Sequence, residues 1–160
     1  MEHVCFLQSP IGILKIRGNN GFVTGLCLLQ GEGAEAALQN QEPPCGLLSE
    51  ARRQLMEYFA GKREKFDLPL AWEGTAFQQR VWKALLQIPY GETRSYADIA
   101  AGIGSPKAVR AVGQANGKNP ILILVPCHRV IHKDGSIDGF ACGMEVKRFL
   151  LELERKKSVS

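Results

Sequence analysis

Two adjacent residues, Cys127 and His128, are of the types that together could carry out nucleophilic chemistry. A thiol is a weak nucleophile while it is protonated, and with an ordinary pKa near 8.5 only about 3% of it is thiolate at pH 7. A nearby imidazole can remove the proton, and a carboxylate can hold that imidazole in the required tautomer. For the pair by itself, a buried structural cysteine beside a surface histidine is the favoured interpretation.

The residues around this pair favour the catalytic interpretation. Cys127 and His128 belong to the run Pro-Cys-His-Arg-Val-Ile-His, residues 126–132, which directly follows an apolar run, residues 121–125. Asn119-Pro120 precedes the apolar run, and Gly139-Phe140 follows the motif. A Cys-His pair with these flanking residues indicates a catalytic cysteine more specifically than the pair alone does.

One helix is predicted before the motif and another after it. Thr75 and Gln78 have the spacing of a capping box, which opens a helix that runs to about residue 88. Its expected apolar face consists of Phe77, Val81, Trp82 and Leu85. The last helix is expected over residues 144–156, with an apolar face of Val146, Phe149, Leu150 and Leu153.

Between these helices, the sequence predicts a helix-turn-helix. Ser95 and Asp98 form a second cap-like pair, which opens a short helix that ends near residue 101. The next helix is expected to be capped by Ser105, to have Pro106 at its first position and to run to about residue 115. Two short helices joined by a turn that contains glycine are typical of this motif.

The first half of the chain has the pattern of a small antiparallel sheet followed by a helix. Strands are predicted over residues 3–8, 13–17 and 22–29, separated by turn residues. Ser49 is expected to cap a helix that ends near residue 61, whereas residues 31–45 show little pattern. Residues 62–73 have the character of an extended connector, so we expect domains at 1–72 and 73–160.

Charge is distributed unevenly along the chain. Residues 1–74 carry seven Lys and Arg against nine Asp and Glu, whereas residues 75–160 carry thirteen against seven. Between Arg94 and Lys133 there are six basic residues and a single acidic one, Asp98. A basic stripe of this kind is expected of a surface that binds a phosphate backbone, although charge alone would favour a solvated face.

Composition limits the class of protein. A 45% hydrophobic content with 22% charged residues is ordinary for a globular protein, and the sequence shows neither a membrane span nor a secretory signal. The five cysteines are odd in number, widely spaced and without a CxxC motif, which favours a reducing compartment. Cys5 and Cys27 could meet across neighbouring strands, but only His3 is nearby, so we expect core residues there and no metal site.

Four segments of residues 75–154, about half of the chain, together resemble the O6-alkylguanine-DNA alkyltransferases, also called methylated-DNA–protein-cysteine methyltransferases. These segments, in the family's order, are GETRSYADIA (91–100), PKAVRAVGQANGKNPI (106–121), PCHRVIH (126–132) and GFACGMEVKRFLLELE (139–154). The resemblance implies an α/β (α+β) protein. Its N-terminal lobe would be ribonuclease-H-like with an antiparallel sheet, and its C-terminal lobe mostly helical with a winged-helix-like helix-turn-helix.

The resemblance also assigns the catalytic residues. Cys127 is implied to attack the alkyl carbon of O6-alkylguanine, and His128 to take the thiol proton through a water. Glu154 matches the carboxylate that orients this histidine, and Asn119 matches the residue that ties down the loop around the cysteine. Because a thioether is a stable product, the resemblance implies a single turnover per protein molecule without any cofactor.

Further residues are implied to hold the base and the DNA. Those assigned to the flipped base are Tyr96, Val130, Phe140, Ala141 and Lys147. Tyr96 and Lys147 are implied to stabilise the guanine leaving group, and the carbonyls of Cys127 and Val130 to accept from its exocyclic amine. Those assigned to DNA are Arg94, Lys107, Arg110, Ala111 and Gly113.

The implied activity is direct-reversal repair of double-stranded DNA that carries O6-alkylguanine, and of O4-alkylthymine as well. The helix with Arg110 is implied to enter the minor groove, where Arg110 fills the stack after the nucleotide flips out. We expect a monomer in the cytoplasm, or in the nucleus of a eukaryote. The chain departs from many relatives in having Ala141-Cys142-Gly143 in place of Ser-Gly-Gly, which bears on the substrate range.

Three other functions are weighed against this one. A lesion-binding relative without repair activity would lack the cysteine of the motif, whereas Cys127 is present. A helix-turn-helix regulator would leave the Cys-His motif and Glu154 without a purpose. A cysteine hydrolase could use Cys127, His128 and Glu154, but it would not become permanently alkylated.

Overall fold

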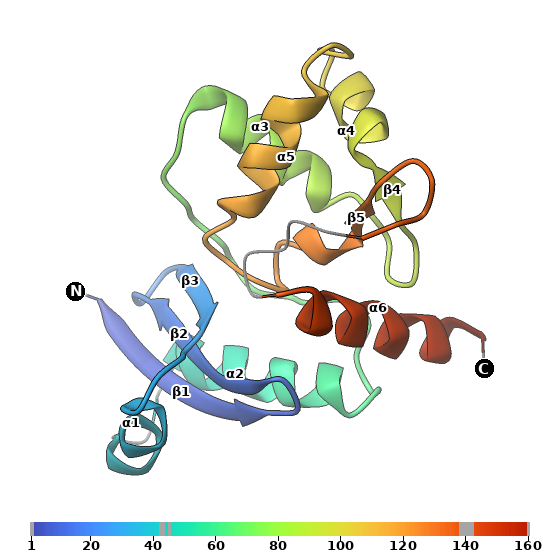
Figure 1. Ribbon diagram of the computed structural model, residues 1–160. Helices are drawn as coiled ribbons and strands as arrows, with labels where there is room; N and C mark the ends of the chain where they lie inside the picture. Colours follow the sequence, from blue (N-terminus) through green and yellow to red (C-terminus); the bar gives the residue numbers. More distant parts are fainter. Residues whose placement is uncertain (1, 42–43, 45, 138–142, 160) are drawn as a thin grey trace. The chain divides into compact units, whose positions relative to one another are not determined.

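The computed structural model describes residues 2–41, 44, 46–137 and 143–159, and it divides the chain into two compact units, Met1–Trp72 and Glu73–Ser160. Each unit has its own secondary structure (Figure 1). None of the helices in the described ranges is long and apolar enough to cross a membrane.

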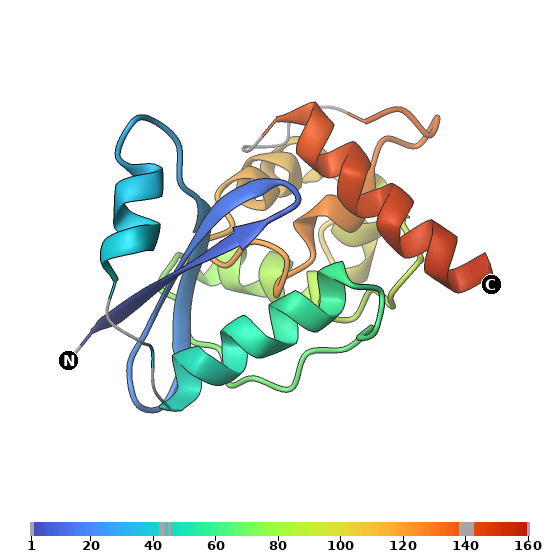
Figure 2. The same cartoon turned by 90° about the horizontal axis from the view of Figure 1, so that it is seen from below.

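The first unit is built on a three-stranded antiparallel sheet in the order β1 (His3–Ser9), β2 (Gly12–Gly18), β3 (Val23–Leu28), as predicted. Cross-strand partners on one face are apolar and buried: Cys5 is opposite Ile16, and Ile16 is opposite Leu26. Helix α2 (Gly46–Phe59) lies along this face (Figure 2). Burial of alternate residues under a helix is what holds this sheet together.

The structure corrects three expectations for this unit. Cys27 is exposed and is opposite Lys15, because it lies on the other face of the sheet from the buried Cys5. Helix α2 begins at Gly46 and not at Ser49, and a short helix that the pattern did not indicate, α1 (Ala34–Asn40), precedes it. The connector is extended as expected, and residues 69–71 pair with Val23 along β3.

The second unit begins with the two predicted capping boxes. In α3 (Ala76–Leu85), the Thr75 hydroxyl accepts from the backbone of Gln78 while the Gln78 side chain accepts from the backbone of Thr75. In α4 (Tyr96–Gly102), Ser95 and Asp98 are paired in the same way. Each box satisfies two backbone N–H groups that would otherwise lack a partner in the first turn of the helix.

Helix α5 (Val109–Gly117) begins later than the sequence indicates. Ser105 to Ala108 form a turn closed by a bond from the Ala108 N–H to the Ser105 carbonyl, and no side chain caps the helix. Ser105 therefore does not act as an N-cap; its hydroxyl accepts from Arg80, which also donates to the Ile103 carbonyl. The turn between α4 and α5 is thus braced by a side chain from α3.

The core of the second unit forms where α3, α4 and α5 meet. The indole of Trp82 is buried and donates from Nε1 to the carbonyl of Ala115 at 2.9 Å, which joins α3 to α5. Gly74, just before α3, lies so close that an added Cβ would come within 2.7 Å of the Trp82 ring. A residue larger than glycine at position 74 would therefore require the Trp82 ring to shift.

Three more elements complete the second unit. They are β4 (Arg94–Ser95), the 3-10 turn η1 with β5 (Cys127–Arg129 and Val130–Ile131), and α6 (Met144–Val159). Strands β4 and β5 form a short parallel pair. Helix α6 buries Leu150 together with two charged residues, Lys147 and Glu154, whereas Phe149 of the predicted apolar face is 37% exposed. A helix that buries charges in this way indicates a functional site.

Candidate active site

The segment that leads to Cys127 is tied down by Asn119. The Asn119 Nδ2 donates to the carbonyl of Val125 at 2.8 Å, and its Oδ1 accepts from the N–H of Ile121 at 2.9 Å. Residues 121–124, which lie between these contacts, are all buried. One amide side chain thus closes both ends of the loop, which is the contact that the role implied for Asn119 requires.

Two tight turns follow within this loop. Ile123 has a φ of 70°, and the N–H of Leu124 donates to the carbonyl of Leu122 at 2.7 Å, which makes a γ-turn of the rare, strained type. Pro126, with φ −81° and ψ 64°, is the centre of an inverse γ-turn from Cys127 to Val125. The positive φ of Ile123 costs about 1–3 kcal/mol and persists only where the surrounding packing imposes it.

Cys127 begins the turn η1 and is 4% exposed. Its carbonyl accepts two hydrogen bonds, one from the N–H of Val130 and one from Nδ2 of Asn116 at 3.3 Å. A carbonyl oxygen has two lone pairs, so both are already used. The structure therefore argues against the expectation that this carbonyl accepts from an exocyclic amine, and the carbonyl of Val130 remains the predicted acceptor.

His128 is completely buried and its ring contacts Glu154, with 2.6 Å between Nε2 and Oε2. The carboxylate of Glu154 accepts two more bonds from Arg129, at 2.8 Å from Nε and 3.1 Å from Nη2, and one from the N–H of Gly91 at 3.4 Å. The remaining terminal nitrogen of Arg129 donates to the Ile88 carbonyl at 2.7 Å. Three segments far apart in the sequence therefore meet at one carboxylate.

The protonation states follow from these contacts. Burial alone would raise the pKa of Glu154, but the hydrogen bonds from His128 and Arg129 outweigh it and lower the pKa to about 2. Burial lowers the pKa of His128 despite the neighbouring carboxylate, so this imidazole is neutral near pH 7. Because an ionised carboxylate only accepts, the proton of His128 must be on Nε2.

The other ring nitrogen of His128 is thereby left as an acceptor. Nδ1 is buried and has no hydrogen-bond partner among the residues that the structure describes. A neutral imidazole whose Nε2–H is fixed by a carboxylate, and whose Nδ1 can accept a proton, is the arrangement of a general base. The structure thus brings His128 and Glu154 together as predicted and sets the direction of the proton transfer.

Two residues at this site were not assigned a role from the sequence. Arg129 lies within the motif, but its partners Glu154 and Ile88 are remote in sequence, and its guanidinium is also 5.7 Å from the ring centroid of Tyr90. Asn116 lies in the segment 106–121 that carries the resemblance, one residue past the predicted end of the helix. For Arg129, the signal available was a basic residue inside an otherwise apolar segment.

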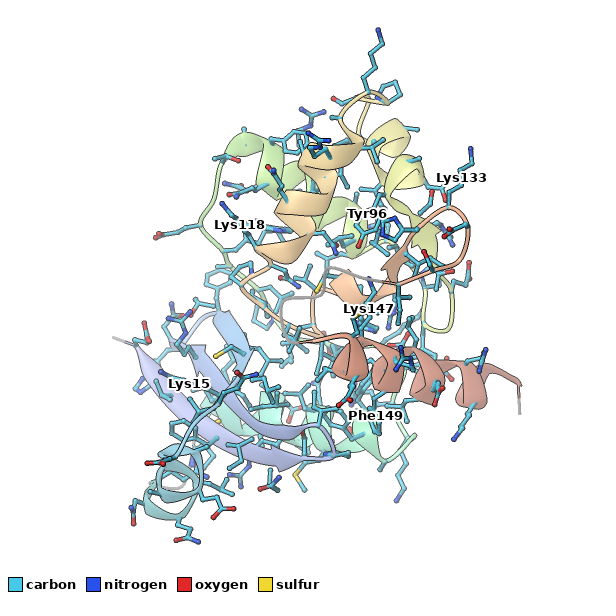
Figure 3. All side chains as sticks on the ribbon, viewed as in Figure 1. Lys15, Tyr96, Lys118, Lys133, Lys147 and Phe149 are labelled. Atoms are coloured by element: carbon cyan, nitrogen blue, oxygen red, sulfur yellow. The ribbon has the colours of Figure 1, made fainter. Side chains whose placement is uncertain are left out.

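Tyr96 and Lys147 form the second cluster of the site (Figure 3). Lys147 is fully buried, and its Nζ lies 3.5 Å from the Tyr96 hydroxyl and 5.8 Å from the centroid of its ring. The ring of His132 lies 5.2 Å from that of Tyr96, centroid to centroid. Phe140 and Ala141, predicted to line the same pocket, lie outside the described residues.

Comparison with known proteins shows the family to which the chain belongs. Residues 3–72 match the 6-O-methylguanine DNA methyltransferase ribonuclease-like domain, and residues 76–156 match the DNA binding domain of the same family. The chain belongs to the 6-O-methylguanine DNA methyltransferase family. Among its relatives are the methylated-DNA–protein-cysteine methyltransferase of Methanosarcina barkeri, 51% identical over 92% of this chain and 94% of that protein, and the constitutive one of Bacillus subtilis, 51% identical over 97% and 96%.

Solved structures of this methyltransferase family have the same fold. The Mycobacterium tuberculosis O6-methylguanine methyltransferase superimposes with a TM-score of 0.86, at 50% identity over 98% of this chain and 94% of that one. A second structure of the M. tuberculosis protein, in complex with DNA, gives 0.85 at 49% identity over 97% and 94%. The predicted fold class is therefore confirmed.

In this methyltransferase, the residues expected to face DNA lie on or near α5. Lys107, Arg110 and Ala111 are exposed, whereas Gly113 is half-buried against the ring of Tyr96. Arg94 is half-buried and forms an ion pair with Glu92 at 3.1 Å. The exposed side of this segment thus carries two basic residues, Arg110 on α5 and Lys107 in the turn before it, while the opposite face of α5 packs in the core. Within the described part of the chain, no group of His, Cys, Asp and Glu could hold a metal ion.

Proposed function

We propose that the protein repairs DNA by removing the alkyl group from O6-alkylguanine and keeping it permanently on Cys127. The observation that carries this proposal is the buried chain from Cys127 and His128 to Glu154, in a protein whose family members are methylated-DNA–protein-cysteine methyltransferases. A buried nucleophile with a fixed general base is what such a displacement needs.

The reaction is an in-line displacement at the alkyl carbon. His128 takes the thiol proton at Nδ1 through one water, and the imidazolium that forms is stabilised by the ionised Glu154. The Cys127 sulfur then forms a bond to the alkyl carbon while the bond from this carbon to O6 breaks. The electron pair of the broken bond goes to the guanine, which takes up the proton that came from the thiol. The products are therefore an unmodified guanine and a thioether on Cys127.

The leaving group is stabilised by the second cluster. Negative charge develops on the purine as the carbon–oxygen bond breaks, and Tyr96 with the buried Lys147 supplies an O–H donor and a positive charge beside it. The carbonyl of Val130 is proposed to accept from the exocyclic amine, and Phe140 and Ala141 to line the pocket. The same pocket would accept O4-alkylthymine.

The exposed face of α5 is proposed to enter the minor groove of the DNA. A nucleotide inside a duplex cannot reach a buried thiol, so the damaged one must flip out, and Arg110 would fill the space it leaves. Lys107 and Arg94 would contact phosphates. Since a single chain contains all of these residues, we propose that the protein acts as a monomer wherever chromosomal DNA is found.

The decisive experiment is mass spectrometry of the protein after mixing it with a duplex that contains O6-methylguanine. The expected result is stoichiometric addition of one methyl group, located on the peptide of Cys127, with no further turnover. Cys127→Ser should bind the duplex as well as the wild type and remain unmodified. DNA binding without modification would support a regulator, and release of a product with Cys127 unchanged would support a hydrolase.

The DNA-facing role of Arg110 is tested by comparing two substrates. Arg110→Ala should slow repair in a duplex more than reaction with a free O6-alkylated base, because a free base does not need to flip. The change should lower the salt dependence of duplex binding by about one phosphate contact or less. Lys65→Ala, which removes an exposed positive charge from the connector of the first unit, is the matched control. Equal losses on both substrates would place Arg110 in the pocket.

A further inference from the structure

Asn116 lies on the buried face of α5 and directly contacts the residue that carries the nucleophile. Its side chain is 3% exposed, and its Nδ2 donates to the carbonyl of Cys127 at 3.3 Å. On the other face of the same helix, Arg110 is exposed. A single short helix therefore carries both the residue expected to enter DNA and a side chain that holds the backbone of the nucleophile.

The other end of this amide is unsatisfied. Oδ1 of Asn116 is buried and has no hydrogen-bond partner among the described residues. Burying a polar group without a partner is unfavourable, and an apolar side chain of similar size, such as leucine, would avoid that cost. Since the carbonyl of Cys127 also accepts from the N–H of Val130, the bond from Asn116 is not needed to satisfy it. Stability therefore does not account for an asparagine at this position.

We propose that Asn116 is a positioning residue that favours the thiolate of Cys127 by holding and polarising the carbonyl of the same residue. The carbonyl oxygen carries partial negative charge and lies in the same residue as the sulfur, so it disfavours a second negative charge there. An N–H dipole directed at that oxygen offsets part of this effect in a buried site, where electrostatic interactions are weakly screened. The donor also limits rotation of the Cys127 peptide.

This inference rests on the proposed function only in that Cys127 is the nucleophile, so its test uses a reagent other than DNA. Iodoacetamide alkylates thiolates: a bond forms from sulfur to carbon, and iodide leaves. The rate at Cys127 is followed by peptide mass mapping, because the other cysteines also react, and it is measured across the pH range. Asn116→Leu removes the donor at similar volume. Asn116→Asp keeps the shape of the side chain, but its carboxylate, when ionised, places a negative charge next to the Cys127 carbonyl.

The expected order of rates near neutral pH is wild type, then Asn116→Leu, then Asn116→Asp. One hydrogen bond corresponds to about a two- to tenfold loss for the leucine variant, and the aspartate variant should lose more. Both losses should shrink as the pH rises and the thiol ionises without help. The same order is expected for methyl transfer from a free O6-methylguanine analogue. Duplex binding should not change.

A buried α5 residue without a hydrogen-bonding side chain provides the control. Val112→Ala should destabilise the helix without changing the pH dependence of the Cys127 rate. A loss that is the same at every pH, or a leucine variant that reacts as fast as the wild type, would overturn the inference. If wild-type protein fails to take methyl groups from DNA, the proposed function fails, yet the iodoacetamide result still decides the role of Asn116.

Discussion

Replacing Glu154 by Gln should be costly in two separate ways, in stability and in reactivity. The carboxylate is buried and accepts bonds from His128, Arg129 and Gly91. A glutamine has one acceptor oxygen, and its NH2 group would face donors where the second oxygen is now. The change would also leave the guanidinium of Arg129, which is 7% exposed, without an anion.

Two independent routes give the size of the loss. Burial raises the pKa of Glu154 and its interactions with His128 and Arg129 lower it, and the net fall from 4.5 to about 2 corresponds to about 3 kcal/mol in favour of the ionised form. Breaking one side of a buried ion pair typically costs about 3–5 kcal/mol. Against a total stability of about 5–15 kcal/mol, either value should be easily measured. The corresponding change at Glu152, exposed on the same helix, should cost less than about 0.5 kcal/mol and serves as the control.

Urea unfolding followed by tryptophan fluorescence measures these losses, and a double-mutant cycle separates their parts. Arg129→Met should cost a similar amount, and the double variant should be hardly worse than either single one, because the second change removes a group that is already unpaired. Additive losses, or a cost below about 1 kcal/mol for Glu154→Gln, would refute the view that this buried pair stabilises the fold.

Reactivity should separate the same variants in a different order. Glu154→Gln should slow methyl transfer most, because the amide cannot hold His128 in the tautomer with a free Nδ1. Arg129→Met keeps the bond between His128 and Glu154 and should retain more of the activity in the fraction that is folded. Equal rates in both variants would mean that the carboxylate acts only through the fold.

Three further outcomes are expected. Gly74→Ala should destabilise the second unit by about 1–3 kcal/mol in thermal unfolding, because its Cβ would come within 2.7 Å of the Trp82 ring; a neutral result would show that the ring moves easily. Because the folded protein holds the pKa of His128 below its ordinary value, stability should fall as the pH drops below about 6.5. The lowered pKa of Glu154 should add a second loss of stability between about pH 4.5 and 2. A urea midpoint that stays constant from about pH 7.5 to 5.5 would contradict the first of these expectations. Asn119→Ala should lower both stability and the Cys127 rate, since it frees both ends of the loop; retention of the wild-type rate would remove it from the site.

Local signals predicted the local structure well. The capping boxes at Thr75 and Ser95 depend on residues three positions apart, and the structure has both of them. Ser105 carried a similar signal, but its backbone closes a turn and its hydroxyl is engaged by Arg80, so tertiary contacts overrode the propensity. Strand pairing likewise decided that Cys27 faces outwards, because that depends on register.

Residues of the site could be predicted from the sequence only where they belong to a motif of a known family. The pairing of His128 with Glu154 spans 26 positions, and it followed from the resemblance to a family and not from spacing. Arg129 and Asn116 had no such guide, since their partners become neighbours only when the chain folds. On α6, the charged residues Lys147 and Glu154 are buried beside Leu150, whereas Phe149 of the predicted apolar face is exposed. The periodicity of apolar residues could not indicate this, because the contacts of the site and not apolar packing determine which charged residues are buried.

The convergence of three distant segments on Glu154 also has a consequence for biosynthesis. During translation Cys127 is made before the carboxylate that completes its base, and 26 residues separate His128 from Glu154. A nascent or truncated chain that ends before α6 would contain the cysteine with an unoriented imidazole, and its thiol should behave as an ordinary one. Cys127 therefore gains its oriented base only after helix α6 has been made and has packed.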